Sequence, residues 1–327
     1  MNKTNRIATR VFLYCGVALV LATAACAAAI GFGGPRAIDP LASINDPFTK
    51  ADFSDVPVPQ MFGARDGTQL AWLHYRAVGG TLQARRIVLV HGSSARARSM
   101  HVLARSLAQA GFDVAALDMR GHGDSGVRGQ AAHVGQLEED LADFLQAVPY
   151  DGPSTLVGFS SGGGFALRFA GGPQQALFDR YVLLAPYLHH AAPINRPHDG
   201  GWVSVGLPRY IALTLLNRLA ITVWNHLPVF RFGLDRAVRD RLTSSYSYTL
   251  AQSFRPRDDW QQDIRQARRP MRLVAGSDDE LFDVRRYANL FSGAGRPLPV
   301  TLVDGVNHIG LTLDPRAVPA IVEACRN

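Results

Sequence analysis

The sequence predicts an α/β domain whose mostly parallel sheet is flanked by helices, with a helical insertion in its second half and a transmembrane helix before it. Three observations support this prediction. The stretch Val11 to Gly33, near the N-terminus, has 23 residues without a charge. From residue 58 onward, short apolar runs alternate with helical patterns, which is typical of parallel strands joined by crossover helices. Across residues 187–265 the alternation stops, and apolar residues recur at helical spacing.

The composition is that of a globular chain and argues against several function classes. Of the 327 residues, 47% are hydrophobic and 19% are charged, which provides ample material for a core. Lys3 and Lys50 are the only lysines, which excludes a phosphate-binding GxxxxGK loop and argues against a Schiff-base lysine. The net charge of +7 forms no basic run, so we expect no nucleic-acid partner. Cys15, Cys26 and Cys325 form no metal-ligand pattern, and we expect no metal site.

Residues 1–33 are predicted to be a membrane anchor or signal segment. As a helix, the uncharged stretch would span about 34 Å, enough to cross the hydrocarbon core of a bilayer. Lys3, Arg6 and Arg10 precede it, which predicts a cytoplasmic N-terminus and a domain in the periplasm or outside a bacterial cell. The alternative is a signal peptide cleaved at one of several alanine-rich sites, which would give a secreted protein. Lipidation at Cys26 is a further alternative.

The remainder is divided into a linker, a core and a cap. Residues 34–57 are rich in Pro, Asp and Ser without clear periodicity and are interpreted as a linker. The α/β core is assigned to residues 58–186 and 266–327, and a helical cap to residues 187–265. Asp66-Gly67 predicts a tight turn between two antiparallel strands at the start of the core.

Each further strand is expected at a short apolar run, and each helix where apolar residues recur every three or four positions. The expected elements of the core are, in order, strand 87–90, helix 100–110, strand 112–117, helix 137–148, strand 155–157, a helix from residue 161, strand 181–184, strand 271–274, helix 284–291, strand 299–303 and a helix from residue 315.

A candidate nucleophile lies between an expected strand and an expected helix. The run Gly158-Phe159-Ser160-Ser161-Gly162 fits G-x-S-x-G, the sharp turn that exposes a serine hydroxyl above a parallel sheet. The preceding strand and the glycine-rich start of the next helix agree with this interpretation. The structural alternative is a glycine-rich helix start that binds an anion or simply turns the chain.

A serine hydroxyl needs an adjacent base, and the base needs an orienting carboxylate. His308 follows the last expected strand, in a loop that could direct its ring toward Ser160. The carboxylate is expected after strand 271–274, where Asp279 is preferred and its neighbours Asp278 and Glu280 are the alternatives. The order serine, aspartate, histidine is the one typical of this sheet architecture.

Donors for a developing oxyanion are expected from two backbone N–H groups. Ser93 follows the strand 87–90, and Ser161 follows the candidate nucleophile, which places their amides opposite each other. His91 is interpreted as a structural residue whose ring packs or hydrogen-bonds beneath the loop.

Five motifs in the right order resemble the α/β-hydrolase family across residues 58–325. Within that family, the sequence is similar to the serine aminopeptidase and monoglyceride-lipase (lysophospholipase-like) branch, which carries a helical cap. The motifs are His91-Gly92, Arg120-Gly121-His122-Gly123-Asp124-Ser125, the G-x-S-x-G turn, Gly276-Ser277-Asp278-Asp279 and Asn307-His308.

The resemblance implies an α/β-hydrolase fold and a serine hydrolase without a cofactor. In this scheme Ser160 attacks a carbonyl, His308 relays the proton and Asp279, selected by the family's glycine-x-x-aspartate spacing, holds the imidazole. The apolar cap and the anchor favour a lipid-like carboxylic ester with an apolar acyl or aryl group. The alternatives are a peptidase or amidase, and a non-catalytic binding protein of the same fold. The sequence departs from the branch after His91-Gly92, which leaves the acyl pocket undefined.

Overall fold

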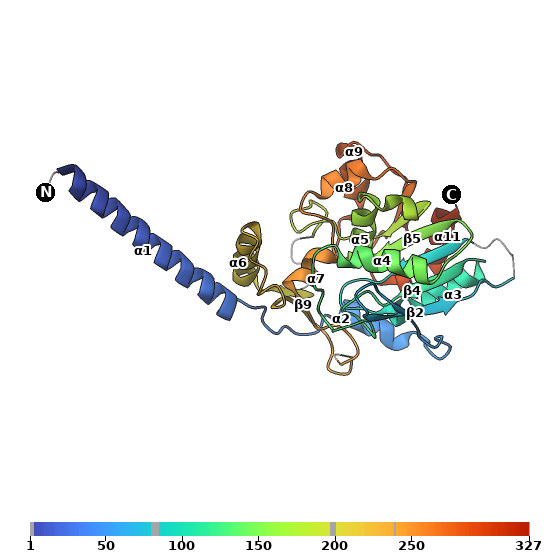
Figure 1. Cartoon of the computed structure of the whole chain (residues 1–327). Helices are drawn as coiled ribbons and strands as arrows, with labels where there is room; N and C mark the ends of the chain where they lie inside the picture. The colour runs from blue at the N-terminus through green and yellow to red at the C-terminus, as the bar shows by residue number, and fades with distance from the viewer. Residues whose placement is uncertain (1–2, 80–84, 197–200, 239, 327) are drawn as a thin grey trace.

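A computed structural model describes residues 3–79, 85–196, 201–238 and 240–326 of the chain. Helix α1 (Lys3–Phe32) projects from a globular body and meets it only at its C-terminal end (Figure 1). Residues 12–32 of this helix are apolar and long enough to cross a membrane.

The body is built on a sheet of eight strands among the described residues, in the order β1-β2-β4-β3-β5-β6-β10-β11. The first two neighbouring pairs in this order are antiparallel and the remaining pairs are parallel. The hairpin at Asp66-Gly67 and the parallel sheet predicted from the sequence are thereby confirmed. The strands are β1 (Gln60–Gly63), β2 (Gln69–Tyr75), β3 (Arg86–Val90), β4 (Asp113–Leu117), β5 (Ser154–Phe159), β6 (Arg180–Leu184), β10 (Met271–Gly276) and β11 (Val300–Val303).

Helices cover both faces of this sheet, which is why every residue of the central strand β3 is buried. Helix α3 packs on β4 and against α11, while α5 packs on β5, β6 and α8. The helices are α3 (His101–Gln109), α4 (Gln136–Ala147), α5 (Ser161–Ala170), α8 (Trp260–Gln266), α9 (Tyr287–Gly293), α10 (Gly310–Leu313) and α11 (Val318–Arg326), with single 3₁₀ turns η2 (Ala97–Met100), η3 (Gln175–Leu177), η4 (Val284–Arg286) and η5 (Pro315–Ala317).

The insertion between β6 and α8 contains strands as well as the expected helices. Strands β7 (Val203–Val205), β8 (Pro228–Phe232) and β9 (Ser245–Ser247) form a small antiparallel sheet. The helices of the insertion are α6 (Leu207–Arg218) and α7 (Tyr248–Ser253). The strands have three to five residues each, so their period-2 pattern is too short to be distinguished from the surrounding helical spacing.

Residues 34–57, interpreted from the sequence as a linker, fold along the cap. They contain α2 (Ala42–Asn45) and the 3₁₀ turn η1 (Asp46–Lys50). The Arg36 amide donates to Ser204 Oγ at 3.0 Å, and Asn45 Nδ2 donates to the Gly233 carbonyl at 3.1 Å. Ile44 is buried in the core cluster. We refer to residues 33–53 as the connecting segment.

Candidate active site

Ser160 lies at the sharp turn between β5 and α5. Its φ of 54° is in the left-handed region that a non-glycine residue rarely adopts. The turn is tight because two glycines lack side chains. A Cβ at Gly158 would overlap the Gly162 carbonyl, and a Cβ at Gly162 would overlap the His91 carbonyl. The two glycines of Gly-x-Ser-x-Gly are therefore required by space, while the unusual backbone conformation falls on Ser160 itself.

His308 and Asp279 form a buried pair at the same edge of the sheet. His308 Nδ1 lies 2.7 Å from Asp279 Oδ2, and both residues are about 1% exposed. Asp279 Oδ1 accepts the backbone N–H groups of Leu281 and Phe282 at 2.9 and 2.8 Å. The carboxylate is thus held by its own turn, and one oxygen remains for the imidazole.

The two alternatives to Asp279 have other positions. Asp278 is exposed and accepts a hydrogen bond from the neighbouring Ser277 hydroxyl. Glu280 accepts the backbone N–H of His308 at 3.0 Å, so it orients the histidine loop through the main chain. Sequence reasoning missed this contact of Glu280, because it depends on a loop 28 residues away.

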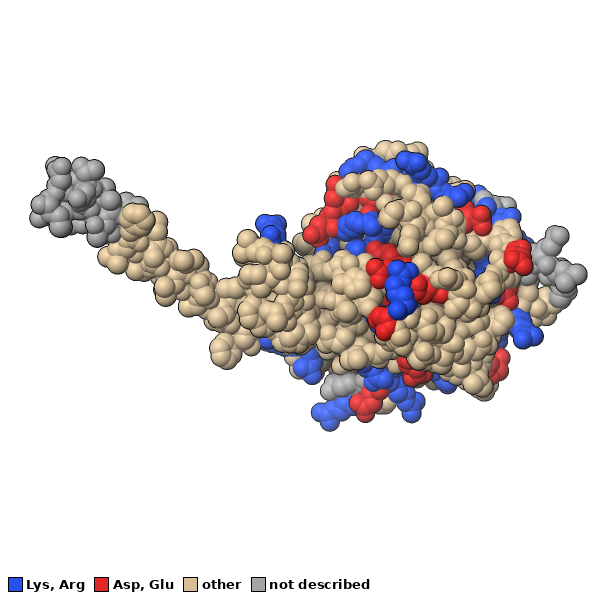
Figure 2. Space-filling view, viewed as in Figure 1, with Lys and Arg blue, Asp and Glu red and all other residues tan. Residues whose placement is uncertain are grey.

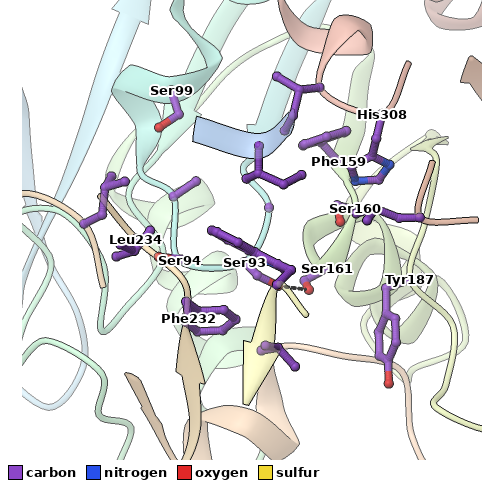
Figure 3. Close-up of a pocket in the computed structure, with 18 of the residues that line it drawn as sticks. Ser93, Ser94, Ser99, Phe159, Ser160, Ser161, Tyr187, Phe232, Leu234 and His308 are labelled. Carbon is purple, nitrogen blue, oxygen red and sulfur yellow. Dashed lines mark hydrogen bonds between the residues drawn. The ribbon is translucent and has the colours of Figure 1, made fainter. Parts of the chain in front are cut away.

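Ser160 and His308 line the same cavity, and Figure 3 shows the imidazole above the serine with no hydrogen bond joining them. The rings of Phe159 and Phe282 flank the imidazole, with centroid distances of 4.8 and 5.3 Å. Contacts between a nucleophile and its base commonly tighten only when substrate binds. These flanking rings restrict the imidazole to orientations near Ser160.

Ser93 and Ser161 meet beside Ser160. Their hydroxyl groups are hydrogen-bonded to each other, as drawn in Figure 3. Within the described part of the chain, neither backbone N–H donates a hydrogen bond. Two unengaged amides next to a partly exposed serine can stabilise negative charge on a carbonyl oxygen.

The loop that carries Ser93 is fixed by the cap. Ser94 has a φ of 65°, and its N–H donates to the Tyr246 hydroxyl at 2.6 Å. Ser94 Oγ donates to the Thr243 carbonyl at 2.7 Å, and the Thr243 N–H donates back to the Ser94 carbonyl at 2.9 Å. Residues near β9 therefore hold the loop from the cap side. Nothing in the sequence pattern relates positions 94 and 246, so this role of Tyr246 is found only in the structure.

Two buried histidines, His91 and His122, support the loop that carries Ser93. Burial lowers the pKa of His91 to about 4 and lowers that of His122 well below its usual value, so both rings are neutral at neutral pH. His91 Nδ1 donates to the Gly92 carbonyl at 2.8 Å, in agreement with its structural interpretation. The Tyr246 hydroxyl donates to His122 Nε2 at 2.6 Å, because His122 Nδ1 faces the Met119 and Arg120 carbonyls.

The Arg120–Ser125 motif connects these elements instead of lining the cavity. Arg120 forms a two-point ion pair with Asp140 of α4, at 2.6 and 2.7 Å. Asp118 accepts the N–H groups of Ala97 and Asp124 at 2.6 and 2.9 Å, which ties the segment after Ser93 to the end of β4. Ser125 Oγ accepts the Ala71 N–H of β2. The motif is therefore structural.

A cavity of about 1010 Å³ extends from Ser160 beneath the cap. Its volume is at the upper end of the roughly 300–1,000 Å³ found for small-molecule sites. Apolar and aromatic side chains dominate its walls, and they come from the connecting segment (Ile44, Phe48, Phe53), the cap (Trp202, Val205, Leu207, Phe230, Phe232) and the core (Phe159, Leu281, Phe282).

The charged residues that line the described part of the cavity are all basic. They are Arg96, Arg98, Arg196, Arg241 and Arg255, and no aspartate or glutamate is among the lining residues that the structure describes. Among the described residues, no group of three or more His, Cys, Asp and Glu side chains is placed to hold a metal ion.

Three features define an α/β hydrolase: the strand order, the serine turn, and the pair formed by Asp279 after β10 and His308 after β11. The chain belongs to the serine aminopeptidase S33 family, whose model matches residues 83–312. This membership confirms the resemblance that the motifs indicate.

The similar proteins include lipases. The chain is 32% identical over 120 residues to a monoacylglycerol lipase of Mycolicibacterium smegmatis, and this match covers 35% of the chain and 39% of that lipase. A soluble variant of the monoglyceride lipase of Saccharomyces cerevisiae has the same fold, with a TM-score of 0.62, 18% identity, and coverage of 85% of this chain and 96% of that one. A bacterial membrane phospholipase A is similar over 99% of both chains, with a TM-score of 0.54 and 19% identity.

Proposed function

We propose that the chain is a serine esterase that hydrolyses lipid-like carboxylic esters with an apolar acyl or aryl group through an acyl-enzyme. The observation that carries this proposal is the buried Asp279–His308 pair beside Ser160, at the end of a large apolar cavity. Membership of the S33 family and the likeness to monoacylglycerol lipase support the ester chemistry.

The first half of the reaction follows from the hydrogen bonds of the pair. His308 Nδ1–H donates to Asp279, which leaves Nε2 free to take the proton of the Ser160 hydroxyl. Ser160 Oγ attacks the ester carbonyl, and the carbonyl oxygen becomes an oxyanion that accepts the N–H groups of Ser93 and Ser161. The intermediate collapses to an ester of Ser160, and His308 gives its proton to the departing alcohol.

In the second half, water replaces the alcohol. His308 Nε2 takes a proton from the water, whose oxygen attacks the acyl carbonyl and forms a second oxyanion in the same place. Collapse of this intermediate releases the carboxylic acid and returns the proton to Ser160 Oγ. Asp279 keeps its negative charge throughout and stabilises the imidazolium that forms in each half.

The walls of the cavity favour an ester over an aminopeptidase substrate. An aminopeptidase must bind the ammonium group at the start of a peptide, and a buried ammonium requires an acceptor or a negative charge. The described lining offers that group no carboxylate. It offers five arginines instead, of which Arg96 and Arg255 are paired with Asp124 and Asp258 outside the lining. An acyl chain makes no such demand and would bury its surface against the aromatic walls.

We also propose that α1 is a retained membrane anchor. The alanine-rich cleavage sites considered above lie inside α1, and the end of this helix is packed on the cap. With Lys3, Arg6 and Arg10 on the cytoplasmic side, the catalytic domain would lie in the periplasm or outside the cell.

The test is turnover of p-nitrophenyl esters from acetyl to palmitoyl by the full chain in detergent. We expect Ser160→Ala to abolish turnover and labelling by a fluorophosphonate probe. Ser106→Ala, which removes a hydroxyl bonded only within α3, is the matched control and should retain both. Folded wild-type protein that neither turns over any ester nor takes the label would refute the esterase proposal.

A further inference from the structure

The end of the N-terminal helix is joined to the cap by one arginine. The last four carbonyls of a helix have no partner within it. Arg209 of α6 donates from Nε to the Ile30 carbonyl at 2.8 Å and from Nη2 to the Gly31 carbonyl at 3.1 Å. Its backbone N–H donates to the Gly33 carbonyl at 3.3 Å. A cation at this end also interacts favourably with the helix dipole.

Two glycines bring the backbones at this joint into contact. A Cβ at Gly33 would lie 2.8 Å from the Arg209 nitrogen, and a Cβ at Gly206 would lie 2.6 Å from the Pro35 nitrogen. Cys26 is half-buried, as are Ala29 and Ile30 one helical turn further along, so one side of the end of α1 is covered. The junction between anchor and cap is therefore a packed joint, in contrast to a free tether.

The cap carries a row of exposed apolar side chains beside this joint. On α6, Leu207, Ile211 and Leu215 recur every four residues and are 50–56% exposed, and Leu219 follows at 71%. The loop behind α6 exposes Ile221, Val223 and Trp224. We call these seven residues the cap face.

The charge around the cap face is one-sided. Residues 200–234 contain no aspartate or glutamate, and the chain has none before Asp39. Figure 2 shows the coloured part of α1 and the adjoining part of the cap almost without charged atoms, whereas both signs of charge appear on the rest of the body. An exposed apolar surface on a segment that carries Arg209, Arg218 and Arg231 and no carboxylate is suited to a phospholipid surface.

We propose that the cap face lies in the surface of the same bilayer that α1 crosses, and that the cavity takes its ester directly from that bilayer. The bilayer is the occupant because the cap face continues the apolar surface of α1 across the Arg209 joint. Val205, Leu207 and Tyr210, next to the joint, also line the cavity, so its cap-side wall and the membrane contact share one element. This inference rests on the proposed anchor and ester substrate.

Lipid contact can be measured without reference to catalysis. In a full chain carrying Cys15→Ser and Cys26→Ser, a bimane label is attached at Ile211→Cys or at Leu215→Cys, because the remaining Cys325 is buried. Val78→Cys is the matched exposed control. Val78 follows β2, which ends beside the start of β4, so it lies at the end of the sheet opposite to the active site and the cap. Val20→Cys reports the insertion of α1.

The labelled chains are reconstituted in phosphatidylcholine–phosphatidylglycerol vesicles with and without bromine on the acyl chains. We expect bromine to reduce emission at least twofold at positions 20, 211 and 215 and to leave position 78 unchanged. Quenching at 20 without quenching at 211 and 215 would overturn the cap proposal and leave the anchor intact. No quenching at 20 would overturn both.

Entry from the bilayer has its own measurement. The double variant Ile211→Ser/Leu215→Ser should turn over soluble p-nitrophenyl butyrate at the wild-type rate, which shows that it is folded. We expect it to lose at least fivefold in activity on a monoacylglycerol presented in the vesicles. Equal activity of the two proteins on vesicle-borne ester, with butyrate turnover intact in both, would contradict entry through this face and leave the esterase proposal standing. Absence of turnover of either ester by the wild type would instead refute the esterase proposal.

Discussion

Replacing Asp279 by asparagine tests whether the buried pair sets the protonation of His308. Asp279 Oδ1 accepts two backbone N–H groups, so the amide oxygen of the introduced asparagine must occupy that position. The opposite rotamer would place an NH₂ group against two donors, at a cost of about 1–3 kcal/mol for each unmade hydrogen bond. The NH₂ group therefore faces His308 Nδ1 and donates to it.

A donor at this position reverses the tautomer of the imidazole. The ring proton moves to Nε2, and the nitrogen nearest Ser160 can no longer act as a base. Asparagine in the corresponding place of a Ser-His-Asp triad lowers kcat about 10⁴-fold, which is about 5 kcal/mol at 1.36 kcal/mol per tenfold change. We expect a loss of that order for Asp279→Asn, with little change in KM.

The assay is the kcat for p-nitrophenyl butyrate with the full chain in detergent, together with a thermal unfolding curve that establishes folding. Asp278→Asn, one residue earlier and exposed, is the control and should keep wild-type kcat. A loss smaller than tenfold in Asp279→Asn, or an equal loss in the control, would show that the buried pair does not act as described.

Three further changes test other parts of the site. Tyr246→Phe leaves the buried Ser94 N–H and His122 Nε2 without partners, so denaturant titration should show a loss of about 2–6 kcal/mol in unfolding free energy, and kcat should fall because the Ser93 loop loosens. The neutral form of His91 stabilises the fold fully above the unfolded pKa of about 6.5, and this contribution is lost as the pH falls toward its folded pKa of about 4. Urea titration should therefore give an unfolding free energy about 2 kcal/mol lower at pH 5 than at pH 7 from this group. If His91→Gln showed the same dependence of unfolding free energy on pH as the wild type, His91 would not be its source. Phe48→Ala should enlarge the cavity and shift the ester series toward longer or bulkier acyl groups, and an unchanged chain-length profile would show that this wall does not contact substrate.

The parts of the fold that were predictable are those encoded by short, contiguous patterns. The strands around Val90 and Leu184 are uninterrupted apolar runs, and Asp66-Gly67 is a local turn signal. The turn at Ser160 is equally local, because glycines two residues before and after it permit the close packing that it needs. Such features depend little on what the rest of the chain does.

Features that depend on distant partners were not predictable from one sequence. The sheet of the cap pairs β7 with β8 across an intervening helix, and neither strand is long enough to show alternation. Tyr246 supports the Ser93 loop from 152 positions beyond Ser94, and nothing in its local sequence differs from that of a packed aromatic residue. Asn45 likewise lies in a stretch that the sequence predicts to be a linker, because its hydrogen bond to Gly233 cannot be inferred from nearby residues.

The contact between Asn45 and Gly233 has a consequence for biogenesis. These residues are 188 positions apart, and Ile44 and Phe48 beside Asn45 form one wall of the cavity. At about 5–20 residues per second, synthesis of the intervening chain takes roughly 10–40 s. Throughout that interval the wall has no cap to pack on, and His308 is made later still. As the membrane-anchored esterase proposed above, a newly inserted chain would be unable to attack the lipids around it until nearly all of it has been synthesised and has folded.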